Sequence, residues 1–266
     1  MLFRSPTPML SLDPGDIHLW LAQPDEIDDA QLHRAYRELC NEQEQQQESR
    51  FHFARDRQRY LVTRALVRTV LSRYEPVAPE AWTFTNNPYG RPQIANTDLG
   101  DAGLTFNVSH TRGLIVLGVT RQRALGVDVE NVLEREVSIE IADRFFAPAE
   151  VTALAAVAPD RQKDRFFEYW TFKESYIKAR GMGLSLPLDK FSFHYPHANA
   201  VRIVIDDELA DDPARWQFWQ FRPSSQHLVA VCAERIQGQD ASVVIRRVIP
   251  MVDATQVPVT FLRTCD

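Results

Sequence analysis

The spacing of apolar and polar residues predicts strands and helices in two separate groups along the chain. Short apolar or alternating runs between turn residues predict strands at residues 17–21, 81–85, 104–109, 114–120 and 127–130. Apolar residues at helical spacing predict long helices at residues 55–74 and 160–180. Later alternating runs predict a second sheet at residues 191–194, 201–205, 216–222 and 227–233, with 243–249 as one more strand. Because strands and helices segregate instead of alternating strictly, the pattern favours the α+β class.

The same pattern indicates where the chain divides. A boundary near residues 121–126 gives two halves of similar size, which we expect to span residues 1–122 and 123–250. Residues 251–266 show no clear periodicity and are expected to form a tail. The very polar stretch 41–49 has no apolar anchor, which predicts a solvated helix end or a loop.

Two short clusters of charged residues carry the candidate chemistry. Asp128 and Glu130 alternate with valines, so a strand places both carboxylates on one face and both valines on the other. Glu174 and Lys178 lie four residues apart, on one face of the second long helix. If that helix packs beside the strand, three carboxylates converge. Three hard oxygen donors suit Mg²⁺ or Mn²⁺, which leave coordination positions open for water and phosphate oxygens.

The same residues also fit simpler roles. Asp128 and Glu130 could decorate a solvated strand edge, while Glu174 and Lys178 could form an ordinary ion pair on a helix. An acidic pair followed by Glu and Lys on a later element also serves metal-dependent nucleases and phosphohydrolases. The net charge of −6 and the lack of a basic stripe in the sequence count against nucleic acid as a partner.

Basic residues gather at the start of the first long helix and in a turn. Arg55, Arg57 and Arg59 occupy the first turns of that helix, where cations oppose the helix dipole. They are therefore either solvated or placed for an anion. Arg91 lies in the sequence NNPYGRP, which predicts a rigid turn with one basic residue at its tip.

Composition and cysteine usage bound the class of protein. Of 266 residues, 44% are hydrophobic and 25% charged, which is typical of a globular chain with sizeable cores. The three cysteines are widely spaced without a CxxC pattern, which predicts reduced thiols and a cytoplasmic setting. Prolines break the N-terminal stretch, and the sequence lacks an apolar run long enough to span a bilayer. We therefore expect neither a signal peptide nor a membrane span.

Five motifs follow one another in an order and spacing typical of one family. They are PYGRP, FNVSH, GVDVE, RFFAPAE and FFEYWTFKESYIKARGMGLSLPL. Together they resemble the Sfp-type 4′-phosphopantetheinyl transferases, and the likeness runs from about residue 50 to about residue 193. The resemblance implies that the phosphopantetheine arm of coenzyme A is moved onto a serine of an apo acyl or peptidyl carrier protein. The second product would be adenosine 3′,5′-bisphosphate.

The resemblance also implies a fold and a division of labour. Two pseudo-symmetric α+β halves would hold coenzyme A in the cleft between them, and one chain would suffice as a monomer. Residues 1–122 would bind the adenine and 3′-phosphate side, whereas residues 123–250 would carry the metal site and receive the carrier protein. The cofactor would be Mg²⁺, with Mn²⁺ as a substitute. A module that binds coenzyme A or a carrier protein without turnover is the non-enzymatic alternative, although every acid of the metal set is present.

Carried over residue by residue, the resemblance assigns the catalytic centre. Asp128, Glu130 and Glu174 would be the metal ligands, and Glu174 would also act as general base toward the carrier serine. Lys178 would contact the pyrophosphate and the leaving group. A base is needed because a serine hydroxyl is a poor nucleophile until its proton is removed.

The resemblance assigns the phosphate contacts as well. His110 would hold a phosphate of coenzyme A, with Ser109 beside it. Arg91 takes the place of the basic residue in the family's YGKP element, near the 3′-phosphate. Arg55 matches an arginine that some members use at the same phosphate. Arg59 fits a ligand role and a structural role equally well.

The sequence departs from the family pattern before the first long helix. Many members carry lysines there, whereas residues 41–49 contain none, and Arg50, Arg55 and Arg57 are the candidate substitutes. An acidic chain must also dock an acidic carrier through a local basic or apolar patch. The aromatic pairs Phe145-Phe146 and Phe166-Phe167 predict an exposed apolar strip for this purpose, with burial of all four rings as the alternative.

Overall fold

The structure is a computed structural model that describes residues 9–97, 103–134 and 139–265. The N-terminal half contains β1 (Asp16–Ala22), α1 (Ala30–Glu38), α2 (Glu42–Ser49), α3 (Ala54–Leu71), β2 (Phe84–Asn86), β3 (Pro92–Ile94), β4 (Leu104–Thr111) and β5 (Leu114–Arg121). The C-terminal half contains β6 (Leu125–Asn131), α4 (Pro148–Ala155), α5 (Pro159–Arg180), β7 (Phe191–His194), β8 (Ala200–Ile205), β9 (Trp216–Phe221) and β10 (His227–Glu234). Three last strands follow, β11 (Ser242–Ile249), β12 (Asp253–Gln256) and β13 (Phe261–Cys265).

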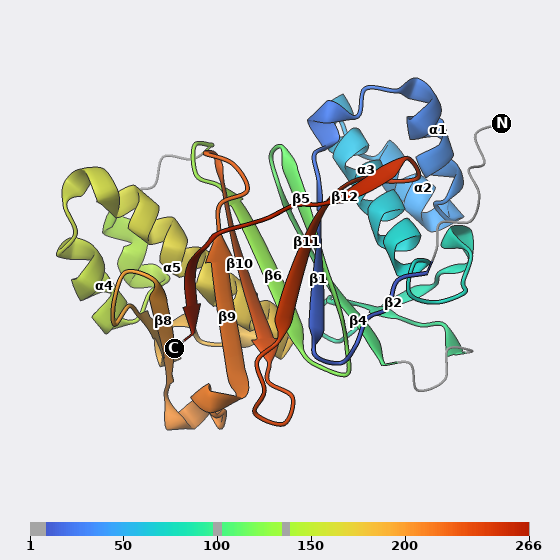
Figure 1. Ribbon diagram of the computed structural model, residues 1–266. Coiled ribbons are helices and arrows are strands. Elements are labelled where there is room, and N and C mark those ends of the chain that lie inside the picture. Colours follow the sequence, from blue (N-terminus) through green and yellow to red (C-terminus); the bar gives the residue numbers. More distant parts are fainter. Residues whose placement is uncertain (1–8, 98–102, 135–138, 266) are drawn as a thin grey trace.

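Two sheets lie side by side, and the helices cover their outer faces (Figure 1). The N-terminal sheet has the order β12-β11-β1-β5-β4, and the C-terminal sheet has the order β6-β10-β9-β13-β8-β7. Helices α1 to α3 lie on one side of the molecule, and α4 and α5 lie on the other. This arrangement confirms the predicted α+β fold with two halves.

Three hydrophobic clusters hold these layers together. One lies between α3 and the N-terminal sheet, and a second lies between α5 and the C-terminal sheet. The third takes residues from both sheets, including Leu19 and Val116 from one and Val127 and Val229 from the other. Because burial of apolar surface is the main stabilising term in folding, this shared cluster joins the halves into one body.

The last three strands correct the expected division of the chain. Strand β11 was predicted to belong to the second sheet, but it pairs in parallel with β1 in the first, and β12 pairs with β11. Strand β13 then lies between β8 and β9 in the C-terminal sheet. Residues 253–265 are therefore not a plain tail, and the chain crosses from one sheet to the other and back.

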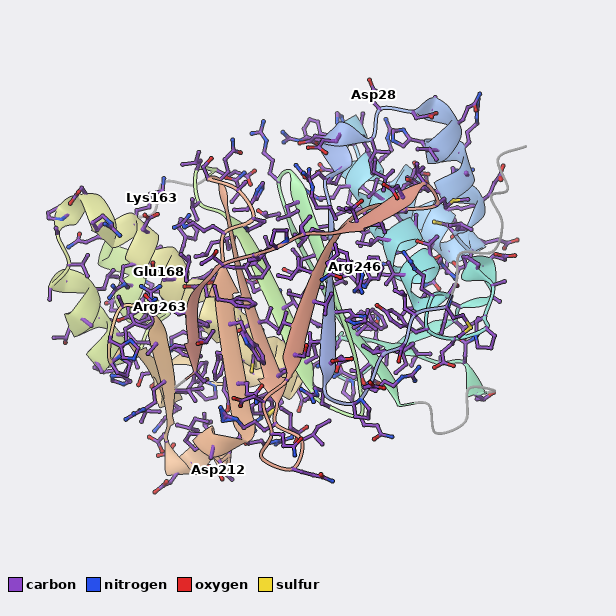
Figure 2. All side chains as sticks on the ribbon, viewed as in Figure 1. Asp28, Lys163, Glu168, Asp212, Arg246 and Arg263 are labelled. Carbon is purple, nitrogen blue, oxygen red and sulfur yellow. The ribbon has the colours of Figure 1, made fainter. Side chains whose placement is uncertain are left out.

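An ion pair fixes β13 to the second long helix. Arg263 on β13 contacts Glu168 on α5, with 3.1 Å between the charged atoms, and the two side chains lie next to each other in Figure 2. Arg263 also donates to Oε1 of Gln220 on β9 and lies over the ring of Tyr195. The final strand is thus held by side chains as well as by its sheet pairing.

The polar stretch 41–49 forms α2, which the sequence analysis described only as a helix end or loop. Asn41 and Glu44 form a capping box, in which each side chain bonds the backbone N–H of the other residue. The Asn-x-x-Glu spacing was visible in the sequence and is a known helix start. Glu44 is buried, and its Oε2 accepts a 2.6 Å bond from Arg68 on α3. A polar helix therefore forms because its one buried acid is paired.

The predicted apolar strip for a carrier protein is wrong. Phe146, Phe166 and Phe167 are all buried in the core beneath α5, and Phe145 packs partly against the same core. These rings supply the packing that a long helix needs against its sheet. Among the described residues, no helix is long and apolar enough to cross a membrane.

Candidate active site

Strands β4 and β6 form the seam between the two halves. They are edge strands of different sheets, and side chains of β4 bond the free backbone N–H groups of β6. Asn107 Oδ1 accepts from Val127 at 2.8 Å, Ser109 Oγ from Val129 at 3.3 Å, and Thr111 Oγ1 from Asn131 at 3.2 Å. These alternating residues point to one side because strand side chains have a period of two. Asn107 and Ser109 of FNVSH thus join the two sheets. His110 follows Ser109 on the strand, so its side chain leaves the opposite face of β4.

Strand β6 carries its acids and its valines on opposite faces, as predicted. Val127 and Val129 are buried in the cluster between the sheets, and Asp128 and Glu130 line the main cleft described below. Helix α5 packs directly onto this strand at Gly126, where a Cβ atom would lie 1.9 Å from a backbone oxygen of the helix. Only glycine fits there, so the helix and the strand come as close as their backbones allow.

A hydrogen-bonded group of three side chains stands at the centre of the site. Lys178 Nζ donates to Asp128 Oδ1 at 2.7 Å and to Ser109 Oγ at 2.9 Å. The Ser109 hydroxyl in turn donates to Asp128 Oδ1 at 3.2 Å. The other oxygen, Asp128 Oδ2, is buried and accepts no hydrogen bond from the residues that the structure describes. A buried carboxylate oxygen without a donor is costly, and a bound cation would satisfy it.

Glu130 is held by an aromatic residue of the helix, Trp170. Trp170 on α5 is only partly buried, and its Nε1 donates to Glu130 Oε1 at 3.0 Å. Its ring also contacts Phe145 edge to face. An indole N–H usually takes a partner when its ring is mostly covered, and this rule could have drawn attention to Trp170 in the motif.

Glu174 lines a second cavity, next to the group formed by Lys178, Asp128 and Ser109. This side cleft, about 250 Å³ in volume, is lined by Tyr89, Gly90, Arg91, Pro92, Asn107, Val108, Glu174, Ile177, Lys178, Gly181 and Gly183. Burial, and then the charge of Asp128, raise the pKa of Glu174, while Lys178 lowers it. A carboxylate with a raised pKa next to a cleft suits proton transfer.

The main cleft lies between the halves. It measures about 430 Å³, and its polar lining includes Asp56, Arg59, Tyr60, Arg64, Ser109, His110, Asp128, Glu130 and Lys178. Residues from α3 form one side, and residues from β4, β6 and α5 form the other. The structure therefore brings five of the predicted residues together with Lys178, which lines both clefts.

The side formed by α3 is basic, and we call Arg59 and Arg64 the basic wall. Arg59 forms a 3.0 Å ion pair with Asp56, one helical turn earlier. Arg64 lies over the ring of Tyr60, and its Nη1 is 3.7 Å from Glu44 Oε1. Its Nε is buried and has no hydrogen-bond partner within the described part of the chain. Arg64 was not predicted, because helical periodicity alone does not say which face of α3 borders the cleft.

Positive charge converges on His110 from both sides of the cleft. Desolvation, followed by the charges of Arg59, Lys178 and Arg64, lowers the pKa of His110 below its ordinary value. This lowered pKa favours the uncharged form of the imidazole. A bound anion would oppose this field and favour protonation of the ring.

Two predicted phosphate contacts lie apart from the basic wall. Arg55 is exposed, lies over the exposed ring of Phe53, and is not among the lining residues of either cleft. Arg91 lines the side cleft, but its guanidinium donates to backbone carbonyls, including those of Lys178 and Leu125. Desolvation lowers the pKa of Arg91.

A buried ion pair anchors α5. Lys173 and Glu150 on α4 have completely buried side chains, and 2.8 Å separates their charged atoms. Lys173 also donates to the carbonyls of Leu188 and Phe191, and Glu150 accepts from the N–H of Phe193. The lysine next to Glu174 in the motif therefore has a structural role.

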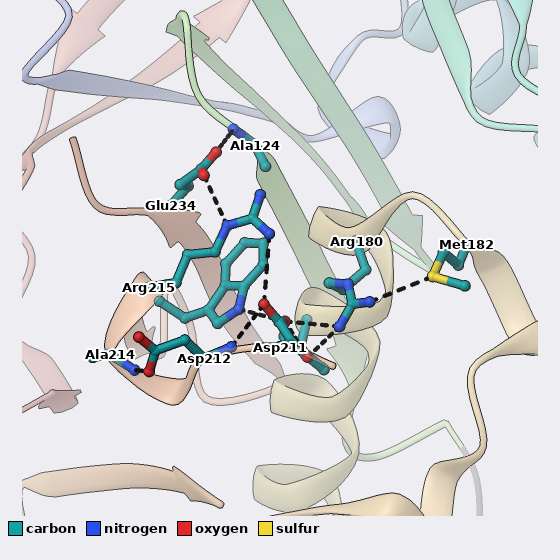
Figure 3. A network of polar contacts seen from close by, with 10 residues as sticks. Ala124, Arg180, Met182, Asp211, Asp212, Ala214, Arg215 and Glu234 are labelled. Atoms are coloured by element: carbon teal, nitrogen blue, oxygen red, sulfur yellow. Dashed lines mark hydrogen bonds and ion pairs between the residues drawn. The ribbon is translucent and has the colours of Figure 1, made fainter. Parts of the chain in front are cut away.

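A second network holds the C-terminal end of α5 (Figure 3). Asp211 accepts hydrogen bonds from Tyr176, Arg180 and Trp216, at 2.6 to 2.8 Å. Arg215 reaches the same carboxylate and also bonds Glu234. The helix then ends at Gly181, whose φ of 67° is the left-handed conformation that glycine adopts without strain. The turn that carries Lys178 is thus fixed from the C-terminal half.

The carboxylates of the site meet some of the requirements for binding a divalent cation. Asp128 has a buried oxygen without a donor, and hard oxygen ligands suit Mg²⁺. Among the described residues, however, no group of three or more His, Cys, Asp or Glu side chains is placed to hold a metal ion. The three-carboxylate site with Asp128, Glu130 and Glu174 therefore stays a proposal.

These observations define the class of the protein. Two α+β halves enclose a cleft that offers carboxylates and a lysine on one side and arginines on the other. Such a cleft suits a substrate with several phosphate groups, because arginine and lysine are the usual partners of phosphate.

Comparison with known proteins gives the family. A model of the 4′-phosphopantetheinyl transferase superfamily matches residues 124–232, and one for the N-terminal part of 4′-phosphopantetheinyl transferases matches residues 26–122. The chain is 36% identical over 184 residues to the 4′-phosphopantetheinyl transferase Sfp of Bacillus subtilis (strain 168), covering 69% of this chain and 77% of that protein. It is 34% identical over 179 residues to the 4′-phosphopantetheinyl transferase HetI of Nostoc sp., covering 67% and 74%. The chain therefore belongs to the 4′-phosphopantetheinyl transferase superfamily, which confirms the resemblance seen in the sequence.

Proposed function

We propose that the protein transfers the 4′-phosphopantetheine arm of coenzyme A to a serine of an apo acyl or peptidyl carrier protein, with Mg²⁺ as its metal ion. The observation that carries this proposal is the main cleft, in which Lys178 and Asp128 face Arg59 and Arg64. Membership of the transferase superfamily supports the reaction type. Both sides of the cleft come from one chain, which supports a monomeric enzyme.

In the proposed reaction the serine oxygen attacks the phosphorus that carries the pantetheine arm. The new bond is serine oxygen to phosphorus, and the bond from that phosphorus to the bridging pyrophosphate oxygen breaks. Adenosine 3′,5′-bisphosphate leaves with the bridging oxygen. Glu174 takes the serine proton, which its raised pKa and its place in the side cleft favour.

The remaining charged residues bind the phosphate groups of coenzyme A. Lys178 contacts the pyrophosphate and stabilises the leaving phosphate, since its Nζ lies between Asp128 and Ser109 at the junction of both clefts. His110, beside Ser109, contacts a phosphate at the edge of β4. Arg59 and Arg64 face the same cleft from α3, and we assign them to the 3′-phosphate.

Asp128 and Glu130 would hold the metal ion together with Glu174. A Mg²⁺ ion held there would supply Lewis-acid chemistry and would neutralise part of the charge on the leaving phosphate. Ser109 and Lys178 fix one oxygen of Asp128, which leaves the buried Oδ2 available. Trp170 orients Glu130 by the bond from its indole nitrogen.

Mass spectrometry of a carrier protein tests this function. The protein is incubated with coenzyme A, Mg²⁺ and an apo carrier protein, and the expected result is a carrier heavier by one phosphopantetheine group on its serine. Binding of coenzyme A without a change in carrier mass would select the non-catalytic module. Breakdown of coenzyme A or of nucleic acid in the absence of a carrier would select the hydrolase or nuclease.

A further inference from the structure

The hairpin turn between β2 and β3 is rigid and points into the junction of the two halves. The side-chain Oδ1 of Asn87 accepts from the backbone N–H groups of Tyr89 and Arg91, both at 2.9 Å. The backbone N–H of Asn87 donates to the carbonyl of Arg91 at 2.9 Å, and Gly90 has a φ of 84°. These bonds close the turn and fix the direction in which Arg91 leaves it.

The guanidinium of Arg91 is surrounded by backbone carbonyls. Its Nη1 donates to Lys178 at 2.5 Å and to Ala179 at 3.4 Å. Its Nη2 donates to Leu125 at 2.9 Å and to Phe106 at 3.4 Å. These carbonyls belong to α5, β6 and β4, so one side chain joins both halves at the seam. Most of the five N–H donors of an arginine are used in this way.

The contacts act on the turn of α5 that carries Lys178. The last carbonyls of a helix have no partner within the helix, and they form the negative end of its dipole. The carbonyl of Lys178 accepts from the N–H of Gly181 at 3.2 Å, and Arg91 adds a shorter, charge-assisted bond at 2.5 Å that fixes the backbone of Lys178. Asn87 adds a second contact, because its Nδ2 donates to the carbonyl of Gly181 at 2.8 Å.

We infer that Arg91 is a positioning residue for Lys178, which joins α5 to the seam, and is not the ligand of the 3′-phosphate of coenzyme A. The inference rests on the proposed function, since it concerns the lysine of that reaction. A phosphate would have to replace the bonds from Arg91 to four backbone carbonyls, and the carbonyl of Lys178 would then keep only the N–H of Gly181, at 3.2 Å. Buried carbonyls without a partner are unfavourable, so the present bonds resist such an exchange.

The first test compares coenzyme A with dephospho-coenzyme A, which lacks the 3′-phosphate. In Arg91→Ala, kcat/KM for both substrates should fall by the same factor, about 10- to 150-fold, which is the range that a charge-assisted hydrogen bond supplies. The preference of the enzyme for coenzyme A should stay at its wild-type value. A loss confined to coenzyme A, with dephospho-coenzyme A unaffected, would overturn the inference.

The second test asks whether Arg91 acts through Lys178. In a Lys178→Ala background, Arg91→Ala should reduce kcat/KM by less than about threefold, since coupled residues are not additive. A purely structural role would cost the same factor in both backgrounds and would overturn the inference. Arg91→Lys keeps the charge but cannot bridge the same carbonyls, so it should stay impaired. A phosphate ligand would instead be largely rescued by lysine.

Two further measurements separate a failure of the role of Arg91 from a failure of the proposed function. Asn87→Ala keeps the guanidinium but removes the bond to Gly181 and the two bonds that close the turn, so it should lower kcat/KM for both substrates by an equal factor that is smaller than that of Arg91→Ala. Affinities of both nucleotides, measured by calorimetry, do not depend on turnover. If wild type binds coenzyme A but does not modify a carrier, the proposed function fails, whereas an unequal change of the two affinities in Arg91→Ala refutes the role of Arg91.

Discussion

The two sides of the main cleft are built by different means. On the side formed by β6 and α5, three of the charged groups have a direct partner: Lys178 bonds Asp128, and Trp170 bonds Glu130. These residues lie on elements whose backbones touch at Gly126. The basic wall instead extends from a single helix, and Arg64 is held by a longer contact to Glu44.

This difference shows that the side of the cleft with the reacting groups is held more rigidly than the basic wall. Reacting groups need positions fixed to a fraction of an ångström, because a small misplacement costs much of the rate. Phosphate recognition tolerates more movement, since a charge acts over a longer distance than a proton transfer. We therefore expect substitutions on the α5 side to affect turnover, and substitutions in the basic wall to affect the choice of nucleotide.

The largest effect is expected at Glu174. Glu174→Gln removes the proposed base while keeping the size of the side chain, so kcat should fall by about 10²- to 10⁴-fold. The measurement is single-turnover transfer to an apo carrier protein at saturating Mg²⁺. Near-normal turnover would show that Glu174 is neither base nor metal ligand.

The next largest effect is expected at the buried ion pair of Lys173 and Glu150, where a substitution should reduce stability. Lys173→Met leaves the charge of Glu150 buried without an opposite charge, which should lower the free energy of unfolding by about 3–5 kcal/mol. Urea denaturation measures this change. Lys190→Met is the matched control, because Lys190 pairs with the exposed carboxylates of Asp206 and Glu208, and its loss should change stability far less. Equal losses in the two variants would contradict the role of the buried pair.

The basic wall should show a smaller effect that depends on the substrate. Arg59→Ala and Arg64→Ala should each reduce kcat/KM for coenzyme A by about 10- to 150-fold, with little change for dephospho-coenzyme A. Arg57→Ala on the exposed side of the same helix is the control and should leave both values unchanged. If both nucleotides lose equally in Arg64→Ala, the side chain supports Tyr60 and Glu44 and does not bind the 3′-phosphate.

The smallest effect is expected at Arg55, which the sequence placed at the 3′-phosphate. Its side chain is exposed, and exposed charges contribute at most about 1 kcal/mol, or roughly fivefold in affinity. Arg55→Ala should therefore reduce the preference for coenzyme A by less than that factor. Kinetics at low and high salt provide the check, because only a screened surface charge loses its effect at high ionic strength. A loss as large as that of Arg64→Ala would place Arg55 in the site.

The sequence predicted the acidic side of the cleft better than the basic one, for a physical reason. The period of two at Asp128 and Glu130, and the four-residue spacing of Glu174 and Lys178, are local properties of a strand and a helix. The side of α3 that borders the cleft depends on how that helix packs, which no local spacing contains. Arg64 was missed for this reason.

Local sequence patterns also could not predict which sheet the last strands of the chain join. The alternation in Ser242–Ile249 predicted a strand correctly, but its partner is β1, more than two hundred residues away. The contacts of Arg91 are similarly remote, since they join a turn to four distant carbonyl groups. Sequence could identify the arginine and its rigid turn, whereas only tertiary structure shows what the guanidinium touches.

The crossing of the last strands has a consequence for how the protein folds. β13 lies inside the C-terminal sheet, between β8 and β9, so that sheet cannot close until residues 261–265 have left the ribosome. β11 must find β1, which lies more than two hundred residues earlier in the chain, and such distant pairings form slowly because a long loop has to be ordered first. The nascent chain therefore exposes open strand edges through most of its synthesis. Completion of both halves is a single late event, which makes this enzyme a candidate for chaperone dependence.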